Sequence, residues 1–285
     1  MSAPRKKTFA VRDYDLAATL ASGQVFRWRL ENGAWTGVIG GRWVRLRAGE
    51  NSITAETVAP PAGWRWLADY LQTGIDFPAV LKSFPADAPL REAVAACRGL
   101  RLLRQEPWEC LASFILSSTK QIVQIRQIIA LLCERFGAPL PVAPGSPPAF
   151  SFPDAARLAA AGEAELRACK MGFRAPYLLA AARAVAGGNV DLDKLRGLSL
   201  DAARAELLEL PGVGPKIADC VLLFGCGFGG AFPIDVWVLK ALRRLYFPRR
   251  QVGARRIAAF AAAHFGPHAG YAQQYLFHYM RTKLK

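Results

Sequence analysis

The hydrophobic pattern of this chain changes once along its length, and that change limits the folds open to it. Within residues 9–57, aromatic and β-branched residues alternate with polar ones at the two-residue period of strands. Gly40-Gly41 separates residues 35–39 from residues 43–46, which predicts a β-hairpin. From Pro89 onward, the apolar residues recur at the spacing of amphipathic helices. Strands followed by a block of helices predict an α+β fold, mostly α, with an N-terminal antiparallel β-sheet domain.

We place the boundary between the two parts after residue 92. Residues 1–92 form the predicted sheet domain, in which residues 24–30 are one expected strand, and residues 93–285 form a helical body. Residues 138–150 hold five prolines and are expected to form a loop. Prolines, glycines and capping residues bound the helical patterns. We predict helices over residues 64–71, 107–118, 122 to about 137, 154–161, 163–169, 176–186, 201–210, 216–224, 235–246, 255–264 and 271–283.

The charge balance indicates a polyanionic partner. The 37 Lys and Arg residues outnumber the 22 Asp and Glu residues, for a formal net charge of +15. Such an excess favours association with nucleic acid or with an anionic membrane surface. The longest apolar stretch, residues 217–232, is interrupted by Asp219 and by glycines, and is shorter than the ~20 residues of a spanning helix. With neither a span nor a basic amphipathic helix, nucleic acid is the expected partner.

Cysteine and histidine spacing argues against a metal centre. The six cysteines are scattered along the chain, which predicts reduced thiols in an intracellular setting. Cys220 and Cys226 form a lone C-x5-C pair, so a tetrathiolate zinc or iron–sulfur site is unsupported. The three histidines lack the H-E-x-x-H spacing of a zinc protease. We therefore expect neither a metal nor an organic cofactor.

Residues 210–216, with the sequence LPGVGPK, carry the most specific chemical signal in the chain. Pro211 ends one helix, and Pro215 suits the first turn of the next. Gly212 and Gly214 permit a tight hairpin that exposes backbone N–H groups beside a helix N-terminus. Such groups bind phosphate oxygens without reading sequence, so the phosphates of DNA are the expected ligand. An ordinary connection between two helices, with no ligand, would use the same residues.

Lys216 and Asp235 add groups suited to nucleophilic catalysis. Lys216 lies at a helix N-terminus, where the positive end of the helix dipole opposes the charged form of its amine. A lysine in such a place can act as a nucleophile. Asp235 follows a glycine-rich turn and begins another helix, so it is also expected to be an N-cap. If the two helices pack side by side, the amine and the carboxylate meet across one small site.

The hairpin, the lysine and the downstream aspartate resemble those of the helix-hairpin-helix DNA glycosylase superfamily. More of the chain, from about residue 10 to residue 280, resembles one branch, the 8-oxoguanine DNA glycosylases. The resemblance implies helix-hairpin-helix glycosylase domains after the sheet, with the active site in the cleft between two helical lobes. The segments that carry it are SGQVFRW at 22–28, PWECLASFILSS at 107–118, MGFRA at 171–175, KIADC at 216–220 and PIDV at 233–236.

The resemblance implies a base-excision-repair enzyme that removes 8-oxoguanine from duplex DNA. By similarity, Lys216 attacks C1′ of a flipped nucleotide, expels the base and forms an imine with the sugar. Loss of a proton from C2′ then cleaves the strand by β-elimination. Asp235 would stabilise the cationic transition state and orient the lysine.

Four further residues match the lesion pocket of this branch. Gly23 matches the position whose carbonyl accepts a hydrogen bond from N7–H of the oxidised base, where guanine has a lone pair. Cys220 and Phe277 match the residues that sandwich the base, and Gln273 matches the one that reads its Watson–Crick edge. Without the resemblance, Gly23 would be interpreted as a turn in the sheet and Phe277 as core.

Five residues are assigned to the DNA interface beside the hairpin glycines. Phe173 matches an aromatic wedge next to the lesion, and Arg174 matches a contact to the orphaned cytosine. Three positions depart from the better-known eukaryotic members. Thr119 replaces an asparagine, Gln124 replaces a second arginine on the cytosine, and Trp237 replaces a histidine. Because a bidentate arginine contact is worth ~1–3 kcal/mol of discrimination, we hypothesise a relaxed choice of opposite base.

Two other interpretations stay open. A glycosylase for alkylated purines would need the aspartate but usually lacks the lysine, so Lys216 argues against it. An inert helix-hairpin-helix DNA-binding module would need the hairpin but not Lys216, Asp235 and Gln273 together. The expected partner is double-stranded DNA containing oxidised guanine, and the expected state is a monomer. We expect an intracellular location, in the bacterial cytoplasm (nucleoid) or the eukaryotic nucleus.

Overall fold

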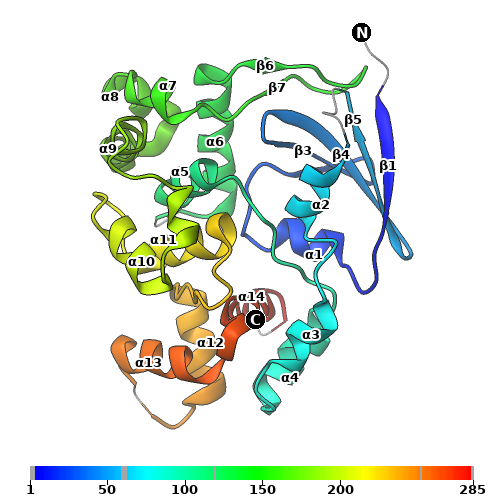
Figure 1. Ribbon diagram of the computed structural model, residues 1–285, viewed down its shortest axis with the longest axis vertical. Coiled ribbons are helices and arrows are strands. Elements are labelled where there is room, and N and C mark those ends of the chain that lie inside the picture. Colours follow the sequence, from blue (N-terminus) through cyan, green and yellow to red (C-terminus); the bar gives the residue numbers. More distant parts are fainter. Residues whose placement is uncertain (1–3, 59–62, 119, 251, 284–285) are drawn as a thin grey trace.

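A five-stranded antiparallel sheet and a larger helical body make up the protein (Figure 1). The computed structural model describes residues 4–58, 63–118, 120–250 and 252–283. The predicted fold class, α+β and mostly α with an N-terminal antiparallel sheet, is confirmed. The strands, in the spatial order β1-β5-β4-β3-β2, are β1 (Arg5–Ala10), β2 (Arg29–Glu31), β3 (Ala34–Ile39), β4 (Arg42–Gly49) and β5 (Ser52–Thr57).

The predicted hairpin joins β3 to β4. Gly40 and Gly41 both have positive φ, 51° and 73°, as the favoured two-residue hairpin turn requires. On one face of the sheet, side chains such as Val44 and Leu46 are buried against α1 (Leu16–Ala21) and α2 (Arg65–Leu71). This packing gives the sheet a hydrophobic core of its own.

The expected strand at residues 24–30 is wrong over most of its length, since regular pairing begins only at Arg29. Gln24, Val25 and Phe26 are buried one after another, so the segment does not alternate as a half-buried strand would. Helix α1 was also not predicted. It is only six residues long and is stabilised at its start by the Asp15 side chain, which accepts from the Ala18 N–H at 2.8 Å.

The helical body has two lobes (Figure 1). One holds α5 (Pro107–Leu116), α6 (Ile122–Phe136), α7 (Ala155–Ala159), α8 (Glu163–Leu166), α9 (Ala175–Ala186), α10 (Leu200–Leu208) and α11 (Pro215–Cys220). The other holds α3 (Phe77–Lys82), α4 (Ala88–Ala96), α12 (Val236–Tyr246), α13 (Ala254–His264) and α14 (Ala269–Thr282). Short 3₁₀ or π-helical segments are η1 (Arg167–Met171), η2 (Gly172–Arg174), η3 (Lys194–Gly197), η4 (Val221–Cys226) and η5 (Gly266–His268).

The helix predicted over residues 64–71 corresponds to α2 beside the sheet, and the other predicted helices have counterparts in this body, whereas α3 and α4 were not predicted. Both are short, and Asp76 and Asp87 cap them by accepting from backbone N–H groups of their first turns. The proline-rich loop at 138–150 contains one small strand pair, β6 (Pro139–Leu140) with β7 (Ala149–Phe150).

Gln24 joins the sheet domain to the helical body. Its side-chain oxygen accepts from the Leu103 N–H at 2.8 Å, and its side-chain nitrogen donates to the Arg101 carbonyl at 2.8 Å. The Gln24 carbonyl accepts from Gln105 Nε2 at 2.7 Å. Gln24 is buried, so these bonds replace those that water would make. They hold the segment around Gly23 against the start of the helical body.

No helix within the described ranges is long and apolar enough to cross a membrane. The same part of the chain holds no group of three or more His, Cys, Asp or Glu side chains that could bind a metal ion. All six cysteines are buried free thiols. Burial raises the pKa of Cys97 to about 11, so this thiol is protonated at neutral pH.

Replacing Gln24 by Leu should lower the free energy of unfolding by about 2–4 kcal/mol, because two buried backbone groups lose their partners. Urea unfolding followed by circular dichroism measures this change. The matched control is Gln127→Leu on the exposed face of α6, which should change stability by less than about 0.5 kcal/mol. A loss below about 1 kcal/mol for Gln24→Leu would contradict the assigned junction.

Candidate active site

Helices α10 and α11 form a helix-hairpin-helix unit, as the segment LPGVGPK predicted. Gly212 has a φ of 82°, and a Cβ atom there would lie 2.5 Å from Tyr177 Cγ, so only glycine fits. Gly214 differs, since its φ is −97° and a Cβ atom built there would have nothing within 4 Å. The Arg204–Asp219 ion pair, at 2.8 Å, braces the two helices. The hairpin therefore requires glycine at 212, whereas packing leaves room at 214.

Lys216 lies in the first turn of α11 and points toward α5. Its Nζ donates to Ser117 Oγ at 3.1 Å and lies 4.9 Å from the centroid of the Phe114 ring. The side chain is half-buried, and Ser117 is the residue at which α5 ends. The amine is thus fixed in position by one hydroxyl and one aromatic face.

Asp235 is the N-cap of α12, as predicted. Its Oδ1 accepts from the Trp237 N–H at 3.0 Å and from the Val238 N–H at 2.8 Å. Burial raises the pKa of the Asp235 carboxyl, and these two N–H groups and the Lys216 charge partly oppose that rise. Lys216 is close enough to act on Asp235 electrostatically, so the structure brings the amine and the carboxylate into one site between the two lobes.

Cys220 faces the same site from the next turn of α11. Burial raises the pKa of its thiol to about 12, and the charge of Lys216 partly opposes that rise while Asp235 adds to it. The thiol is therefore neutral at neutral pH, and Cys220 contributes a compact apolar surface. The structure brings Lys216, Cys220 and Asp235 together.

Gln273 and Phe277 lie one turn apart on α14 and are both buried. The side-chain oxygen of Gln273 is buried and has no hydrogen-bond partner among the described residues. A Cβ atom built on Gly23 would lie 3.4 Å from Phe277 Cε1 and 3.1 Å from Ile122 Cδ1. Gly23, near the N-terminus, thus meets the face of α14 that carries Phe277.

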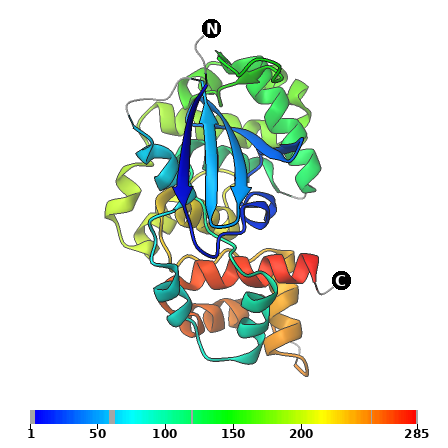
Figure 2. The same cartoon turned by 90° about the vertical axis from the view of Figure 1, so that its right-hand side faces the viewer.

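The Gly23 segment is anchored to α14 by a hydrogen bond. Gln274 Nε2 donates to the Ser22 carbonyl at 3.1 Å, and both residues are buried. In Figure 2, α14 crosses directly below the strands, which places the C-terminal helix next to the sheet domain. The φ of Gly23 is 83°, a conformation that other residues resist, so glycine is required here by the backbone as well as by close packing.

Sequence reasoning missed Arg281, whose side chain lies beside Gly23 and Phe277. Its Nη1 lies 3.4 Å from the Cβ position of Gly23, and its Cζ lies 5.1 Å from the centroid of the Phe277 ring. Burial lowers the pKa of Arg281, and the charge of Asp235 partly opposes that effect. A signal was present in the sequence, because Gln273, Phe277 and Arg281 are each four residues apart and so share a helix face.

The side chain of Phe173 is exposed, as a DNA wedge requires. It is 54% exposed and follows Gly172, whose φ is 60°. Its ring packs edge-on against Tyr177 at 6.5 Å, the same tyrosine that packs against Gly212. Trp237, in the first turn of α12, is also exposed. Large exposed aromatic groups are therefore present both beside the hairpin and beside Asp235.

Arg174 and the position of Gln124 were assigned to the opposite base, and Thr119 was assigned to the DNA interface. Arg174 is not the solvated cation that its sequence context alone would suggest, because it is 2% exposed and donates to the carbonyls of Met171, at 3.3 Å, and Ser118. Gln124 is exposed, and its Oε1 accepts from the Gln121 N–H at 3.1 Å at the start of α6. Thr119 lies outside the described residues.

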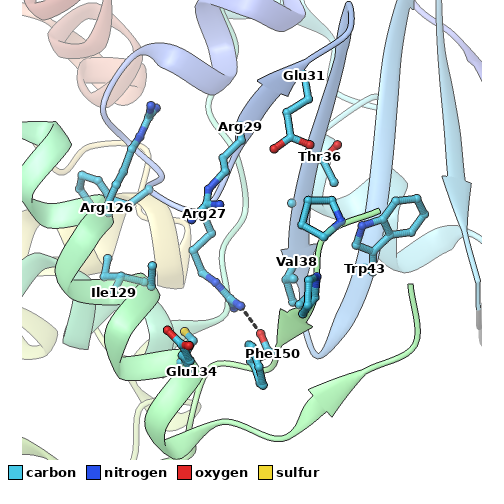
Figure 3. A pocket seen from close by; sticks show the side chains of 17 residues that line it. Arg27, Arg29, Glu31, Thr36, Val38, Trp43, Arg126, Ile129, Glu134 and Phe150 are labelled. Atoms are coloured by element: carbon cyan, nitrogen blue, oxygen red, sulfur yellow. Dashed lines mark hydrogen bonds between the residues drawn. The ribbon is translucent and has the colours of Figure 1, made fainter. Parts of the chain in front are cut away.

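A cavity with several arginines in its walls lies away from Lys216. It has a volume of about 320 Å³ and lies between the sheet, α6 and β7 (Figure 3). Arg27 crosses it and donates to the Phe150 carbonyl, and Arg29 and Arg126 also line it. No residue assigned above to catalysis or to the lesion pocket lines this cavity. Lys216 and the residues around it therefore lie outside this cavity.

Comparison with known proteins accounts for this arrangement. A family model described as 8-oxoguanine DNA glycosylase, N-terminal domain, matches residues 8–111, and the HhH-GPD superfamily base excision DNA repair protein model matches residues 112–263. The chain is 32% identical to the probable N-glycosylase/DNA lyase of Methanothermobacter thermautotrophicus, over 95% of each chain. The chain belongs to the 8-oxoguanine DNA glycosylase family. It is a base-excision-repair DNA glycosylase that also has lyase activity, so the family prediction is confirmed.

Solved structures of this family share the whole fold. The structure of MBOgg1 in complex with a low-affinity DNA ligand superposes with a TM-score of 0.93 at 35% identity, over 98% of this chain and 96% of that one. The 8-oxoguanine glycosylase/lyase of Clostridium acetobutylicum, bound to double-stranded DNA containing cytosine opposite 8-oxoG, gives 0.90 at 29% identity, over 98% and 99%. The family architecture therefore extends over both the sheet and the helical body.

Replacing Asp235 by Asn should separate stability from activity. Asn keeps the N-cap bonds and removes a carboxylate whose pKa is raised in the folded state, so its ionisation costs stability. At pH 7 the variant should melt at the wild-type temperature or about 2 °C above it. The difference should vanish as pH falls below 3.8, the ordinary value for the carboxyl, because both states of the wild type are then protonated.

Excision by the same Asp235→Asn variant should fall at least about 100-fold, because the site loses its fixed negative charge. Single-turnover strand nicking measures this loss. Asp154→Asn, at the exposed N-cap of α7, is the matched control and should leave the rate unchanged. Retention of excision within twofold in Asp235→Asn would exclude the carboxylate from the reaction.

Proposed function

We propose that this glycosylase removes 8-oxoguanine from duplex DNA through a covalent imine on Lys216. The observation that carries the proposal is the meeting of the Lys216 amine and the Asp235 carboxylate in one site. The amine nitrogen attacks C1′ as the bond from C1′ to the base breaks, and the base leaves with a proton. One amine proton goes to the departing base and the other goes to O4′ as the bond from C1′ to O4′ breaks, which leaves a C=N bond between Lys216 and C1′.

Strand cleavage follows from the same imine. The C=N bond acidifies C2′, so a proton acceptor can remove a proton there. A double bond then forms between C2′ and C3′ as the bond from C3′ to the phosphate oxygen breaks. Water then releases Lys216 from the sugar. Asp235 stabilises the positive charge that develops on the sugar, because a carboxylate held rigidly by the N-terminus of α12 needs no rearrangement during the reaction.

The walls of the pocket support an oxidised purine as the base. Phe277 and the Cys220 thiol offer apolar surfaces, and the buried oxygen of Gln273 lacks a partner that a base N–H would supply. The Gly23 carbonyl can accept from N7–H of 8-oxoguanine, whereas the N7 lone pair of guanine would be repelled. A flipped base is thus tested by one polar contact at each of two edges.

Double-stranded DNA is the proposed partner, and the hairpin is its proposed anchor. Nothing lies within 4 Å of where a Cβ on Gly214 would be, which leaves room for a phosphate group at the N-terminus of α11. Exposed Phe173 supplies the wedge that would fill the space left by the flipped nucleotide. The net charge of +15 favours this association at every DNA sequence.

Contacts within the protein support a relaxed choice of opposite base. The Arg174 guanidinium already donates to two carbonyls of its own chain, and the Gln124 side chain caps α6. These bonds restrict how far the two side chains can turn toward a cytosine. A glutamine also lacks the positive charge and the fork geometry of arginine. We infer weaker discrimination for cytosine than two free arginines would provide.

Borohydride reduction on duplex DNA with one 8-oxoguanine tests the mechanism. The wild type should form a covalent complex, and Lys216→Gln should form none and lose excision, because it has no amine. Lys82→Gln, on the exposed surface of α3, is the matched control and should trap DNA as the wild type does. Tight binding without an adduct in the wild type would favour an inert helix-hairpin-helix module.

Excision rates with each of the four bases opposite 8-oxoguanine test the second part of the proposal. The preference for cytosine should stay below thousandfold, since each lost bidentate contact removes about 1–3 kcal/mol of discrimination. Gln124→Arg should increase that preference by restoring one guanidinium. A thousandfold or greater preference in the wild type would defeat the hypothesis.

A further inference from the structure

Arg281 has unused hydrogen-bonding capacity at the edge of the lesion pocket. Its guanidinium carries five N–H donors, and none of them donates to a described residue. The side chain is half-buried, so water satisfies these donors only in part. A guanidinium in this position favours a hydrogen bond to an oxygen acceptor of a bound ligand.

Charged side chains act on the Arg281 guanidinium from two sides. Asp235 attracts Arg281 from the catalytic side. Arg126 repels it from the side of the large cavity, where Arg126 extends from α6 (Figure 3). Burial and the charges of Arg29 and Arg281 lower the pKa of Arg126. The guanidinium of Arg281 lies on the opposite side, beside Gly23 and Phe277.

The proposed substrate has an acceptor next to the atom that Gly23 would contact. Oxidation of guanine changes two neighbouring groups, because N7 gains a hydrogen and C8 gains the carbonyl oxygen O8. A protein site that recognises this edge must offer one hydrogen-bond acceptor for N7–H beside one donor for O8. Gly23 supplies the carbonyl, and Arg281 Nη1 lies 3.4 Å from the Cβ position of that same residue.

We propose that Arg281 donates a hydrogen bond to O8 of the flipped base, so that Gly23 and Arg281 together read the oxidised edge. This inference rests on the proposed function and adds a specificity-determining residue to it. The contact is charge-assisted and forms in a largely buried pocket, where an unpaired donor is costly. Guanine has only a hydrogen on C8, so it would leave the guanidinium without that acceptor.

A contact from Arg281 to a phosphate of the flipped nucleotide is the main alternative. The two contacts differ in what they require of the DNA. A contact to O8 needs the base, whereas a contact to phosphate persists when the base is missing. Cleavage of a duplex that already contains an abasic site therefore separates them, since that substrate uses Lys216 and the backbone but offers no O8.

The experiment compares Arg281→Met and Arg281→Gln with wild type on two otherwise identical duplexes, one with 8-oxoguanine and one with an abasic site. Single-turnover excision of 8-oxoguanine should fall about 10- to 100-fold in both variants, as expected for loss of a charge-assisted hydrogen bond. Abasic-site cleavage should stay within twofold of wild type, with an unchanged pH profile. Arg29→Met is the control. Arg29, like Arg281, acts electrostatically on Arg126, but it lines the large cavity and not the proposed lesion pocket, so its loss should not affect either reaction.

Three outcomes would overturn the inference. Equal losses on both duplexes would indicate a phosphate contact, and a shifted pH profile on abasic DNA would indicate an effect through Asp235. Full excision of 8-oxoguanine by both variants would show that Arg281 makes no contact with it. Failure of the wild type itself to excise 8-oxoguanine would instead reject the proposed function. Abasic cleavage in the variants also reports that they fold.

Discussion

The half-buried carboxylate of Asp235 and the amine of Lys216 form the interaction on which the proposed active site of this glycosylase depends. Burial alone disfavours the charged form of Asp235, and two backbone N–H groups of α12 and the Lys216 amine compensate. Neither partner has a fixed position without its helix, since one caps α12 and the other opens α11. The relative placement of the two lobes therefore decides whether this chain has an active site.

The lesion pocket adds a second requirement, that the two ends of the chain meet. Gly23 follows the first helix, whereas Phe277 lies on the last. Two buried glutamines make the connection, because Gln24 bonds the residues that lead into α5 and Gln274 bonds the carbonyl of Ser22. The sheet domain thus places Gly23 beside α14, at the proposed lesion pocket.

Local signals were sufficient for much of the fold and for part of the site. The glycine pair at 40–41, the LPGVGPK hairpin and the Asp235 cap each act over a few residues, so their structures follow from backbone preference. Prediction failed where burial overrode local pattern. Residues 24–28 are irregular because Gln24 is buried and bonded to distant backbone, and Arg174 is buried although a loop arginine would ordinarily face water.

The sequence by itself determined the class of fold and the hairpin, because these depend on short-range periodicity, capping and spacing. Its motifs also resembled one family, and they pointed to Lys216 and Asp235 as the proposed amine and carboxylate. Only the tertiary structure decided that Gly23 faces Phe277 and that Arg281 borders the same pocket between Asp235 and Arg126. It also decided that Arg174 and Gln124 are bonded within the protein. The physical reason is that burial and electrostatic neighbours belong to packed side chains from distant segments, and no local pattern specifies which segments will meet.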